Sequence, residues 1–298
     1  MQTLDTTRPR IGRLGIWSLE LRTLPRHEVA EHVGALERDG WDAVWVAGAN
    51  GPGLWRDAET MLTATTDLTV AFGVMSIWGQ DAGGATSEHA RLTSRHGRRL
   101  LVGLGVSNPQ AAAATGRTYR SAIGSMTDYL DSLDGAPTPL APADRVLGAL
   151  GPRMTALAGA RSAGAHPFLV TPGAHARSRA LLGSRALLMP HQAVVLESSP
   201  ERAREIARRG IGTYLRFPTY RRSLLDQGFS PEDLAGKGSD RLIDAVVAWG
   251  GVDAVGARVR EHWDAGADHV ALHVLTDDGE VPAAQWAQLA ELLETRPE

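Results

Sequence analysis

The sequence predicts an α/β protein that folds as one (β/α)8 TIM barrel. Amphipathic helices alternate with short apolar strands along the chain, and eight candidate strands can be counted. Strands that are apolar on both faces are typical of a parallel sheet covered by helices. The 298 residues are enough for the roughly 250 that such a barrel requires, with room for insertions.

One unit recurs along the chain: an amphipathic helix, a glycine-containing turn and an apolar strand. In its first copy the helix ends at Gly40, and residues 43–46 follow as a buried strand. Similar units surround Gly164 and Gly266. Because each helix leads straight into a strand, neighbouring strands are expected to run parallel.

The predicted strands cover residues 13–19, 43–47, 68–76, 99–106, 145–150, 167–171, 191–196 and 269–275. Predicted helices include 125–134, 152–161, one that starts at Ser199 and Pro200, and a last one over 284–294. The largest insertion, 210–249, follows the seventh strand, and residues 230–234 predict a helix start within it. No stretch separates independent units, so we expect a single domain over 1–298.

An open, doubly wound sheet is the alternative fold. Such a sheet more often has about five to seven strands and a glycine-rich phosphate-binding turn after the first one. Here the first strand ends in Trp17, Ser18, Leu19 and Glu20, without a glycine. The barrel is therefore the favoured architecture.

Composition excludes several classes of protein. The chain has no cysteine, which excludes disulfide scaffolds, thiolate metal sites and cysteine nucleophiles. A formal charge of −3 offers no electrostatic footprint for nucleic acid or an anionic membrane. No apolar run approaches the about 20 residues of a membrane span, and the N-terminus has no apolar leader. We expect a cytoplasmic protein with a small-molecule substrate and no metal.

The chemistry of a TIM barrel lies at the carboxyl ends of its strands, and here these ends carry little charge. The only lysine, Lys237, lies in a glycine-flanked loop, so a Schiff-base aldolase is disfavoured. No strand carries the histidine and carboxylate series of a metal-dependent hydrolase. Glu20 and Glu197 are the only candidates for a glycosidase pair, a minor alternative. An apolar, hydroxyl-bearing and glycine-rich mouth favours chemistry by a bound cofactor.

Three glycine-containing strand ends would let backbone amides approach such a cofactor. They are residues 103–108, residues 150–152 around Gly151, and residues 171–175 around Gly173. The last two open helices, whose free N–H groups attract anions such as phosphate. The alternative interpretation of each motif is structural: close strand packing in the first, and an ordinary helix start in the other two.

Together these motifs resemble the luciferase-like monooxygenase superfamily, most closely its branch of probable coenzyme F420-dependent oxidoreductases. The resemblance covers nearly the whole chain. The stretches that carry it, in order, are GLGVS (103–107), RVLGALGPRM (145–154), GAHPFLVTP (164–172), QAVVLE (192–197), GSDRL (238–242) and AGADHV (265–270).

The resemblance implies a barrel that binds a flavin or deazaflavin across its mouth, and commonly a homodimer. In relatives the ring rests on a bulge with a non-proline cis peptide at the end of strand three, which maps to Gly73 and Val74. The cofactor-binding residues implied by position are Gly73, Val74, Met75, Ser107, Asn108, Leu150, Gly151, Thr171, Gly173, Ala174 and His175. Asn108 and His175 are the candidate catalytic residues, and Trp17, Trp55 and Trp78 are expected to wall the substrate pocket.

The chain departs from the relatives at three places. Ala47, Gly48 and Ala49 stand where many relatives have an acidic residue near the ring. The common Arg-Asp-Pro after strand three is Gln-Asp-Ala at 80–82, followed by two glycines, and a common proline is replaced by Ser121.

The sequence and its resemblance leave three candidate functions. The first is hydride transfer between F420 and an unknown organic substrate, with Asn108 and His175 polarising substrate or coenzyme. The second is an FMN-dependent monooxygenase of the same superfamily. The third is a non-catalytic flavin or deazaflavin carrier, suggested by the missing acid at the end of strand two.

Overall fold

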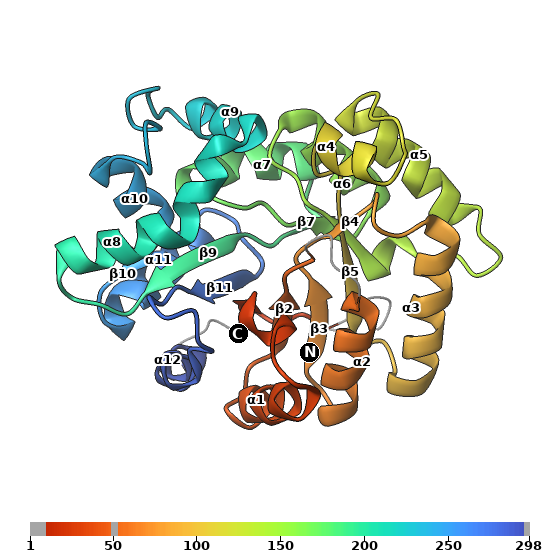
Figure 1. The fold of residues 1–298 in the computed structure, drawn as a ribbon, viewed down its shortest axis with the longest axis horizontal. Helices are drawn as coiled ribbons and strands as arrows, with labels where there is room; N and C mark the ends of the chain where they lie inside the picture. The colour runs from red at the N-terminus through yellow and green to blue at the C-terminus, as the bar shows by residue number, and fades with distance from the viewer. Residues whose placement is uncertain (1–9, 49–52, 295–298) are drawn as a thin grey trace.

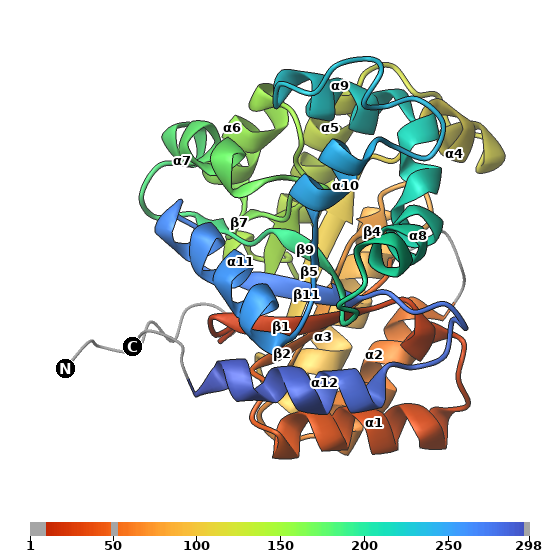
Figure 2. The same ribbon diagram turned by 90° about the vertical axis from the view of Figure 1, so that its left-hand side faces the viewer.

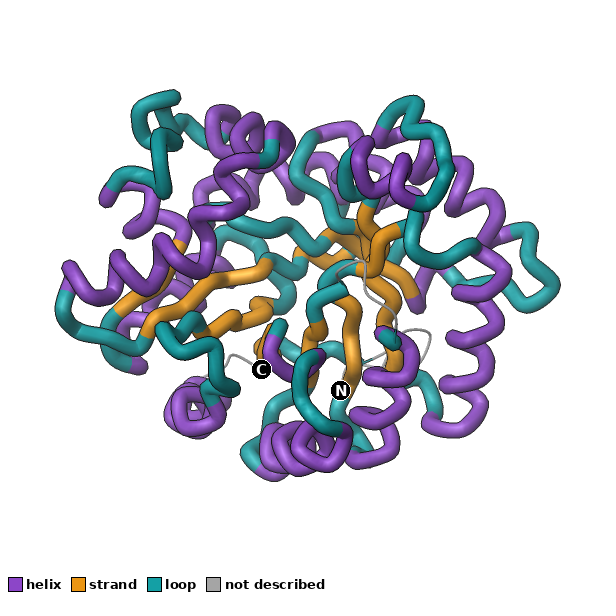
Figure 3. The backbone as a smooth tube through the Cα atoms, viewed as in Figure 1, coloured by secondary structure: helices purple, strands orange, loops and turns teal. Residues whose placement is uncertain are grey.

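The computed structural model describes residues 10–48 and 53–294. Strands occupy its centre and helices lie around them (Figure 1 and Figure 3). The strands are β1 (Leu14–Ser18), β2 (Ala43–Val46), β3 (Thr69–Phe72), β4 (Met75–Ser76), β5 (Leu100–Gly105), β6 (Arg145–Leu147), β7 (Gly164–Ala165), β8 (Leu187–Leu188), β9 (His191–Val195), β10 (Val247–Trp249) and β11 (Val270–Val274).

The helices are α1 (Arg26–Arg38), α2 (Leu54–Ala64), α3 (Ala82–His96), α4 (Pro109–Ala114), α5 (Ala122–Asp134), α6 (Pro152–Arg161), α7 (His175–Leu182), α8 (Pro200–Ile211), α9 (Pro218–Asp226), α10 (Asp240–Val246), α11 (Val252–Asp264) and α12 (Ala283–Leu289). Short 3-10 turns are η1 (Glu20–Arg22), η2 (Pro142–Asp144), η3 (Pro172–Ala174), η4 (Gly212–Arg216) and η5 (Ala290–Leu293).

Every strand pairing among the described residues is parallel, as predicted. The strand order is β10-β9-β11-β1-β2-β3-β5-β6-β7-β8, and β4 pairs with β5 beside this path. β8 and β9 are separated only by Met189 and Pro190. The Met189 amide donates to Ala165 O at 2.9 Å, and Pro190 O accepts from the Ala271 amide at 2.9 Å. One short stretch of chain is therefore hydrogen-bonded to both β7 and β11.

Three apolar clusters stabilise the fold. The largest fills the space between the sheet and helices such as α1, α2 and α11. A second surrounds α8, α9 and α10. The third lies on the inner face of the sheet and includes Trp17, Trp45 and Met189. The last helix, α12, packs beside α1, which brings the two ends of the described chain to the same side (Figure 2). In the described ranges no helix has the length and apolar character needed to cross a membrane.

The predicted strand over 167–171 is wrong. Its apolar residues suggest a strand, but the strand residues are Gly164 and Ala165, and backbone bonding to the neighbouring strands ends at Pro167, whose carbonyl accepts from the His191 amide at 2.9 Å. Leu169 has φ +53°, which a strand does not allow. Gln227 from the segment after α9 binds this loop instead, since its Nε2 donates to Leu169 O at 3.3 Å and its Oε1 accepts from the Thr171 amide at 2.9 Å.

Two further strand predictions need correction. The single strand expected over 68–76 is divided into β3 and β4 by a bulge at Gly73 and Val74. The strand β10 was not predicted, because its three residues lie inside the stretch 210–249 that we expected to be an insertion.

The prediction at Ala49 lies outside the described residues. The glycines after Asp81 do not prevent α3, since the Asp81 carboxylate accepts from the Gly84 amide at 2.8 Å and begins the helix.

Candidate functional site

The bulge between β3 and β4 contains a cis peptide bond between Gly73 and Val74. This non-proline cis bond is the feature that the resemblance implied at these two residues. The Gly73 amide donates to Val46 O at 2.8 Å, so the bulge stays attached to β2. Met75, the next residue, is 5% exposed and pairs with Leu104 of β5. The bulge is therefore held by the strands on both sides of it.

Glycines surround the bulge and make room for it. A Cβ on Gly48 would collide with the carbonyl group of Val74. A Cβ on Gly105 would lie 2.5 Å from Val74 Cγ2, and one on Gly148 would lie 3.2 Å from the same atom. On Gly103 a Cβ would lie 2.9 Å from Val74 Cγ1. Side chains at these positions would displace Val74, which explains glycine at the ends of three different strands.

The opposite side of the sheet's inner face is filled by aromatic and imidazole rings. The Trp17 ring lies 4.4 Å from the ring of His273 and 5.2 Å from that of His191, centroid to centroid. Phe168 stacks on His191 at 3.8 Å, and Tyr214 of η4 packs on Phe168 at 4.7 Å. The site thus has one half made of glycines and a peptide bulge, and one half made of bulky rings.

The histidines of the ring half are neutral. His191 Nε2 and His273 Nδ1 are 3.0 Å apart, so they share one proton. Burial lowers the pKa of His273 to about 3, and burial together with His273 lowers the pKa of His191 well below its ordinary value. Neither ring is a cation at neutral pH, so the pair can hydrogen-bond a ligand but is a weak general acid.

Unpaired polar atoms of two buried side chains meet at Gly73. Trp17 Nε1 and His166 Nε2 have no hydrogen-bond partner among the described residues. A Cβ on Gly73 would collide with Trp17 Nε1 and lie 3.3 Å from His166 Nε2. His166 Nδ1 lies 2.7 Å from Met189 O and therefore carries the proton, which leaves Nε2 as an acceptor. One donor and one acceptor are thus free beside the bulge.

The strand ends predicted to hold a phosphate also lie together. Leu150, Val170 and Ala174 line a cavity of about 50 Å³. A Cβ on Gly151 would meet nothing within 4 Å, and one on Gly173 would meet only Thr171 Oγ1, at 3.9 Å. The backbone is therefore open to a ligand at both glycines. Thr171 itself is less available, because its amide and hydroxyl both donate to Gln227 Oε1.

His175, predicted as a catalytic and cofactor-binding residue, faces away from the strand ends. Its side chain is completely buried between α7 and α11, where Nε2 lies 2.7 Å from His262 Nδ1. His262 Nε2 donates to Gln192 Oε1 at 2.6 Å, because the Gln192 amide nitrogen donates to two carbonyl oxygens. Burial lowers the pKa of His175 to about 4. The ring therefore joins two helices to β9 as a neutral, structural group.

Asn108 and Ser107 lie at the end of β5, where they were expected. Asn108 Oδ1 accepts from the Ala111 amide at 2.9 Å and begins α4. Ser107 is exposed and has φ +54°, an uncommon conformation for a residue other than glycine. The Asn108 oxygen is thus engaged in the helix cap, and only its amide nitrogen remains for a ligand.

The three predicted pocket tryptophans lie in different places. Trp17 belongs to the ring half of the site. Trp78 lines a cavity beside the site, and its Nε1 donates to Val106 O at 2.5 Å. Trp55, also predicted to wall the pocket, packs edge-on against Phe72 between α2 and the sheet, at 5.1 Å between centroids. Trp55 lies on the face of α2 that packs against the sheet, where a large aromatic side chain buries much apolar surface.

The two carboxylates considered for a glycosidase, those of Glu20 and Glu197, accept hydrogen bonds from neighbouring residues in their own turns. Glu20 Oε2 accepts from Ser18 Oγ at 2.7 Å, and Glu197 Oε1 accepts from the Ser199 amide at 2.8 Å. Within the described ranges no three histidine, aspartate or glutamate side chains gather as metal ligands. His273 falls at the end of the last predicted strand, where the sequence favours a place in the barrel interior over a catalytic role, and it is buried there. The sequence did not single out its partner His191, although His191 also falls on a predicted strand, nor the packing role of Gly48.

The fold is a parallel α/β sheet whose strand ends bring a glycine-lined bulge next to a cluster of buried rings. No family model and no curated protein matches the sequence. Solved structures do match over nearly the whole chain. An F420-dependent secondary alcohol dehydrogenase, in complex with an F420-acetone adduct, has a TM-score of 0.75 at 12% identity and covers 97% of this chain and 100% of its own.

Two other solved structures show the same likeness. Coenzyme F420-dependent tetrahydromethanopterin reductase from Methanopyrus kandleri has a TM-score of 0.66 at 14% identity, covering 94% of this chain and 97% of its own. The FMN-bound oxygenating constituent of 3,6-diketocamphane monooxygenase from Pseudomonas putida has a TM-score of 0.69 at 15% identity, covering 95% and 97%. The predicted resemblance is thus confirmed at the level of the fold.

Proposed function

We propose that the protein is an F420-dependent oxidoreductase of the luciferase-like type, which transfers hydride between the deazaflavin and an organic substrate. The observation that carries the proposal is the bulge at Gly73 and Val74, which glycines from three strand ends surround. The likeness to two F420-dependent enzymes supports it. We also propose that the sheet closes through residues 187–195 into the predicted eight-stranded barrel, because this stretch bonds to both β7 and β11.

The residues present fit a flat ring with a phosphate-bearing tail. The glycine half offers a surface without side chains, and Trp17 Nε1 and His166 Nε2 offer a donor and an acceptor next to it. The open backbone at Gly151 and Gly173 is suited to the phosphate. The bound coenzyme supplies the carbon that gives or takes the hydride.

The protein's own groups would orient the reactants and exclude water. Trp17 and Phe168 present apolar rings beside the bulge. The His191–His273 pair, neutral at pH 7, would hydrogen-bond a substrate oxygen without giving up a full proton. The amide nitrogen of Asn108 remains the candidate donor at the end of β5.

An FMN-dependent monooxygenase is the second candidate, favoured by the likeness to the FMN-bound monooxygenase. The third candidate, a non-catalytic carrier, was suggested by the missing acidic residue at the end of strand two, and this argument is now weaker. Glycine at 48 has a packing reason, because any side chain there would collide with the Val74 carbonyl. At position 48, one of the three where relatives have an acidic residue, the absence of a side chain is therefore a requirement of the bulge as much as a change in chemistry.

Titration of the purified protein with F420 and with FMN, followed by fluorescence, tests the proposal. We expect a micromolar or tighter Kd for F420 and weaker binding of FMN. Tighter binding of FMN would favour the monooxygenase, and no binding of either would overturn both. Turnover of reduced F420 with a panel of enones or alcohols then separates an enzyme from a carrier.

Replacing Gly173 with aspartate is expected to weaken coenzyme binding by at least about tenfold, because a carboxylate would face the phosphate. The fold should tolerate the change, since a Cβ at Gly173 meets only Thr171 Oγ1, at 3.9 Å. Gly173→Asn is the matched neutral control and should bind within a few-fold of the unchanged protein. Equal affinity for both variants would place the phosphate elsewhere.

A further inference from the structure

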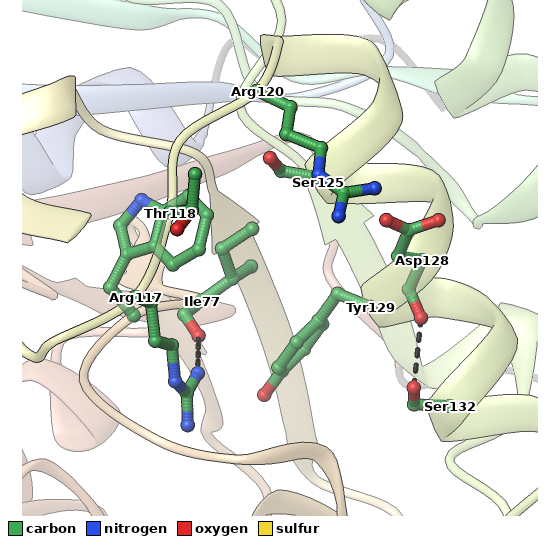
Figure 4. A pocket seen from close by; sticks show the side chains of 9 residues that line it. Ile77, Arg117, Thr118, Arg120, Ser125, Asp128, Tyr129 and Ser132 are labelled. Carbon is green, nitrogen blue, oxygen red and sulfur yellow. Dashed lines mark hydrogen bonds between the residues drawn. The ribbon is translucent and has the colours of Figure 1, made fainter.

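A cavity of about 370 Å³ lies between the segment that follows β4 and helix α5, beside the bulge but outside the sheet (Figure 4). Figure 4 shows side chains approaching it from the two sides. Its lining residues are Ile77, Trp78, Arg117, Thr118, Arg120, Ser125, Asp128, Tyr129 and Ser132. The volume is at the lower end of the range for small-molecule sites, and the cavity is open to solvent on one side.

The floor of the cavity is apolar and held in place. Ile77 is 1% exposed, and Trp78 and Tyr129 are each 7% exposed. Trp78 Nε1 donates to Val106 O at 2.5 Å, and the Tyr129 hydroxyl donates to Gln80 O at 3.1 Å. Because both polar ends are engaged elsewhere, the two rings present mainly their apolar surfaces to a ligand.

The rim carries an excess of positive charge. Arg117 Nη1 donates to Ile77 O at 3.0 Å, which fixes this guanidinium at the cavity edge. Arg120 also lines the cavity, makes no hydrogen bond and no ion pair with residues 10–48 or 53–294, and extends its guanidinium toward Ser125 and Asp128 of α5 in Figure 4. Asp128 is the one carboxylate among the lining residues. Two guanidinium groups against one carboxylate favour an anion.

We propose that this cavity binds a small organic anion with a planar apolar body. The body would pack on Trp78 and Tyr129, and the anionic group would take the free donors of Arg120. The hydroxyls of Thr118 and Ser125 lie on the same lining and add donors. This site does not depend on which coenzyme the protein uses, because none of its lining residues belongs to the glycine half or to the ring half described above.

A pair of dyes that differ only in charge tests the proposal. The aromatic anion 8-anilinonaphthalene-1-sulfonate and the neutral N-phenyl-1-naphthylamine are titrated into the intact protein, with fluorescence excited through tryptophan. Arg120→Ala should weaken binding of the sulfonate at least about tenfold and change binding of the neutral dye by less than about twofold. Asp128→Asn removes a repulsive charge and should strengthen binding of the sulfonate.

Two further variants complete the test. Ser125→Leu on α5 fills the cavity and should weaken both dyes, while circular dichroism checks that the fold is kept. Arg38→Ala, an exposed arginine on α1, should change neither dye. The proposal is overturned if Arg120→Ala leaves sulfonate affinity unchanged, if it affects both dyes equally, or if Ser125→Leu leaves both affinities unchanged.

Discussion

Replacing Gly103 with alanine is expected to destabilise the protein by about 3 kcal/mol or more and to abolish coenzyme binding. The new Cβ would collide with the carbonyl oxygen of Phe72 and lie 2.9 Å from Val74 Cγ1. Neither neighbour can move easily. Phe72 is completely buried in β3, and Val74 is enclosed by Gly105 and Gly148 on its other sides. Strand β5 would therefore separate from β3 where the bulge begins.

Urea unfolding measures the loss of stability, and fluorescence titration with F420 measures the loss of binding. Gly48→Ala is a second variant directed at the bulge itself, since its Cβ would meet the Val74 carbonyl group. Gly251→Ala is the control, because a Cβ there has nothing within 4 Å; as a change at the N-cap of α11 it should cost at most about 1 kcal/mol and leave binding unchanged. Unchanged binding in both bulge variants would show that the bulge does not support the coenzyme.

Acid is expected to unfold the protein near pH 5. Burial lowers the pKa of His166 and His175 to about 4, and that of His269 and His273 to about 3, from an ordinary 6.5. Below pH 6.5 the unfolded chain therefore binds more protons than the folded protein. As the pH is lowered from 6.5 to the pKa of the folded state, each histidine therefore reduces the free energy of unfolding by about 1.4 kcal/mol per pH unit.

Four such groups together would remove on the order of 5 kcal/mol per pH unit, against a total stability of roughly 5 to 15 kcal/mol. Urea unfolding followed by circular dichroism between pH 7.5 and about 5 measures the slope. The glutamine of the His175→Gln variant cannot be protonated in this pH range. The slope of the free energy of unfolding against pH should therefore decrease by about 1.4 kcal/mol per pH unit, although the variant is also less stable at pH 7.5. His27→Ala is the control, because its side chain is 76% exposed. A stability that does not change over this range would contradict the argument.

Much of the fold could be predicted from the sequence. The alternation of helices and strands and the parallel pairing were correct, because apolar periodicity and glycine turns act within a few residues. The motifs also placed the cis bond at Gly73 and Val74 through the resemblance. The strand predicted over 167–171 does not form. Its apolar residues pack against the segment around α9 instead, and Gln227 donates a hydrogen bond to Leu169 O in this loop.

The site was less predictable than the fold. His175 is at the predicted loop, but its ring faces His262, 87 residues further along the chain. Trp55 is apolar and close to a strand end in sequence, yet it packs against Phe72 in the outer core. Neither orientation follows from spacing along the chain. Asn108 shows a third case, since a polar residue before a proline can serve a helix cap as well as a substrate.

By itself, the sequence determined the local elements, the parallel sheet and the absence of thiolate chemistry, since these depend on residue type and short-range periodicity. Only the tertiary structure decided which glycines adjoin Val74, which histidines are buried as neutral rings, and that Arg120 shares a cavity with Trp78 and Tyr129. These properties arise from contacts between residues on different strands and helices. Such contacts set packing, desolvation and charge, and no pattern along the chain contains them.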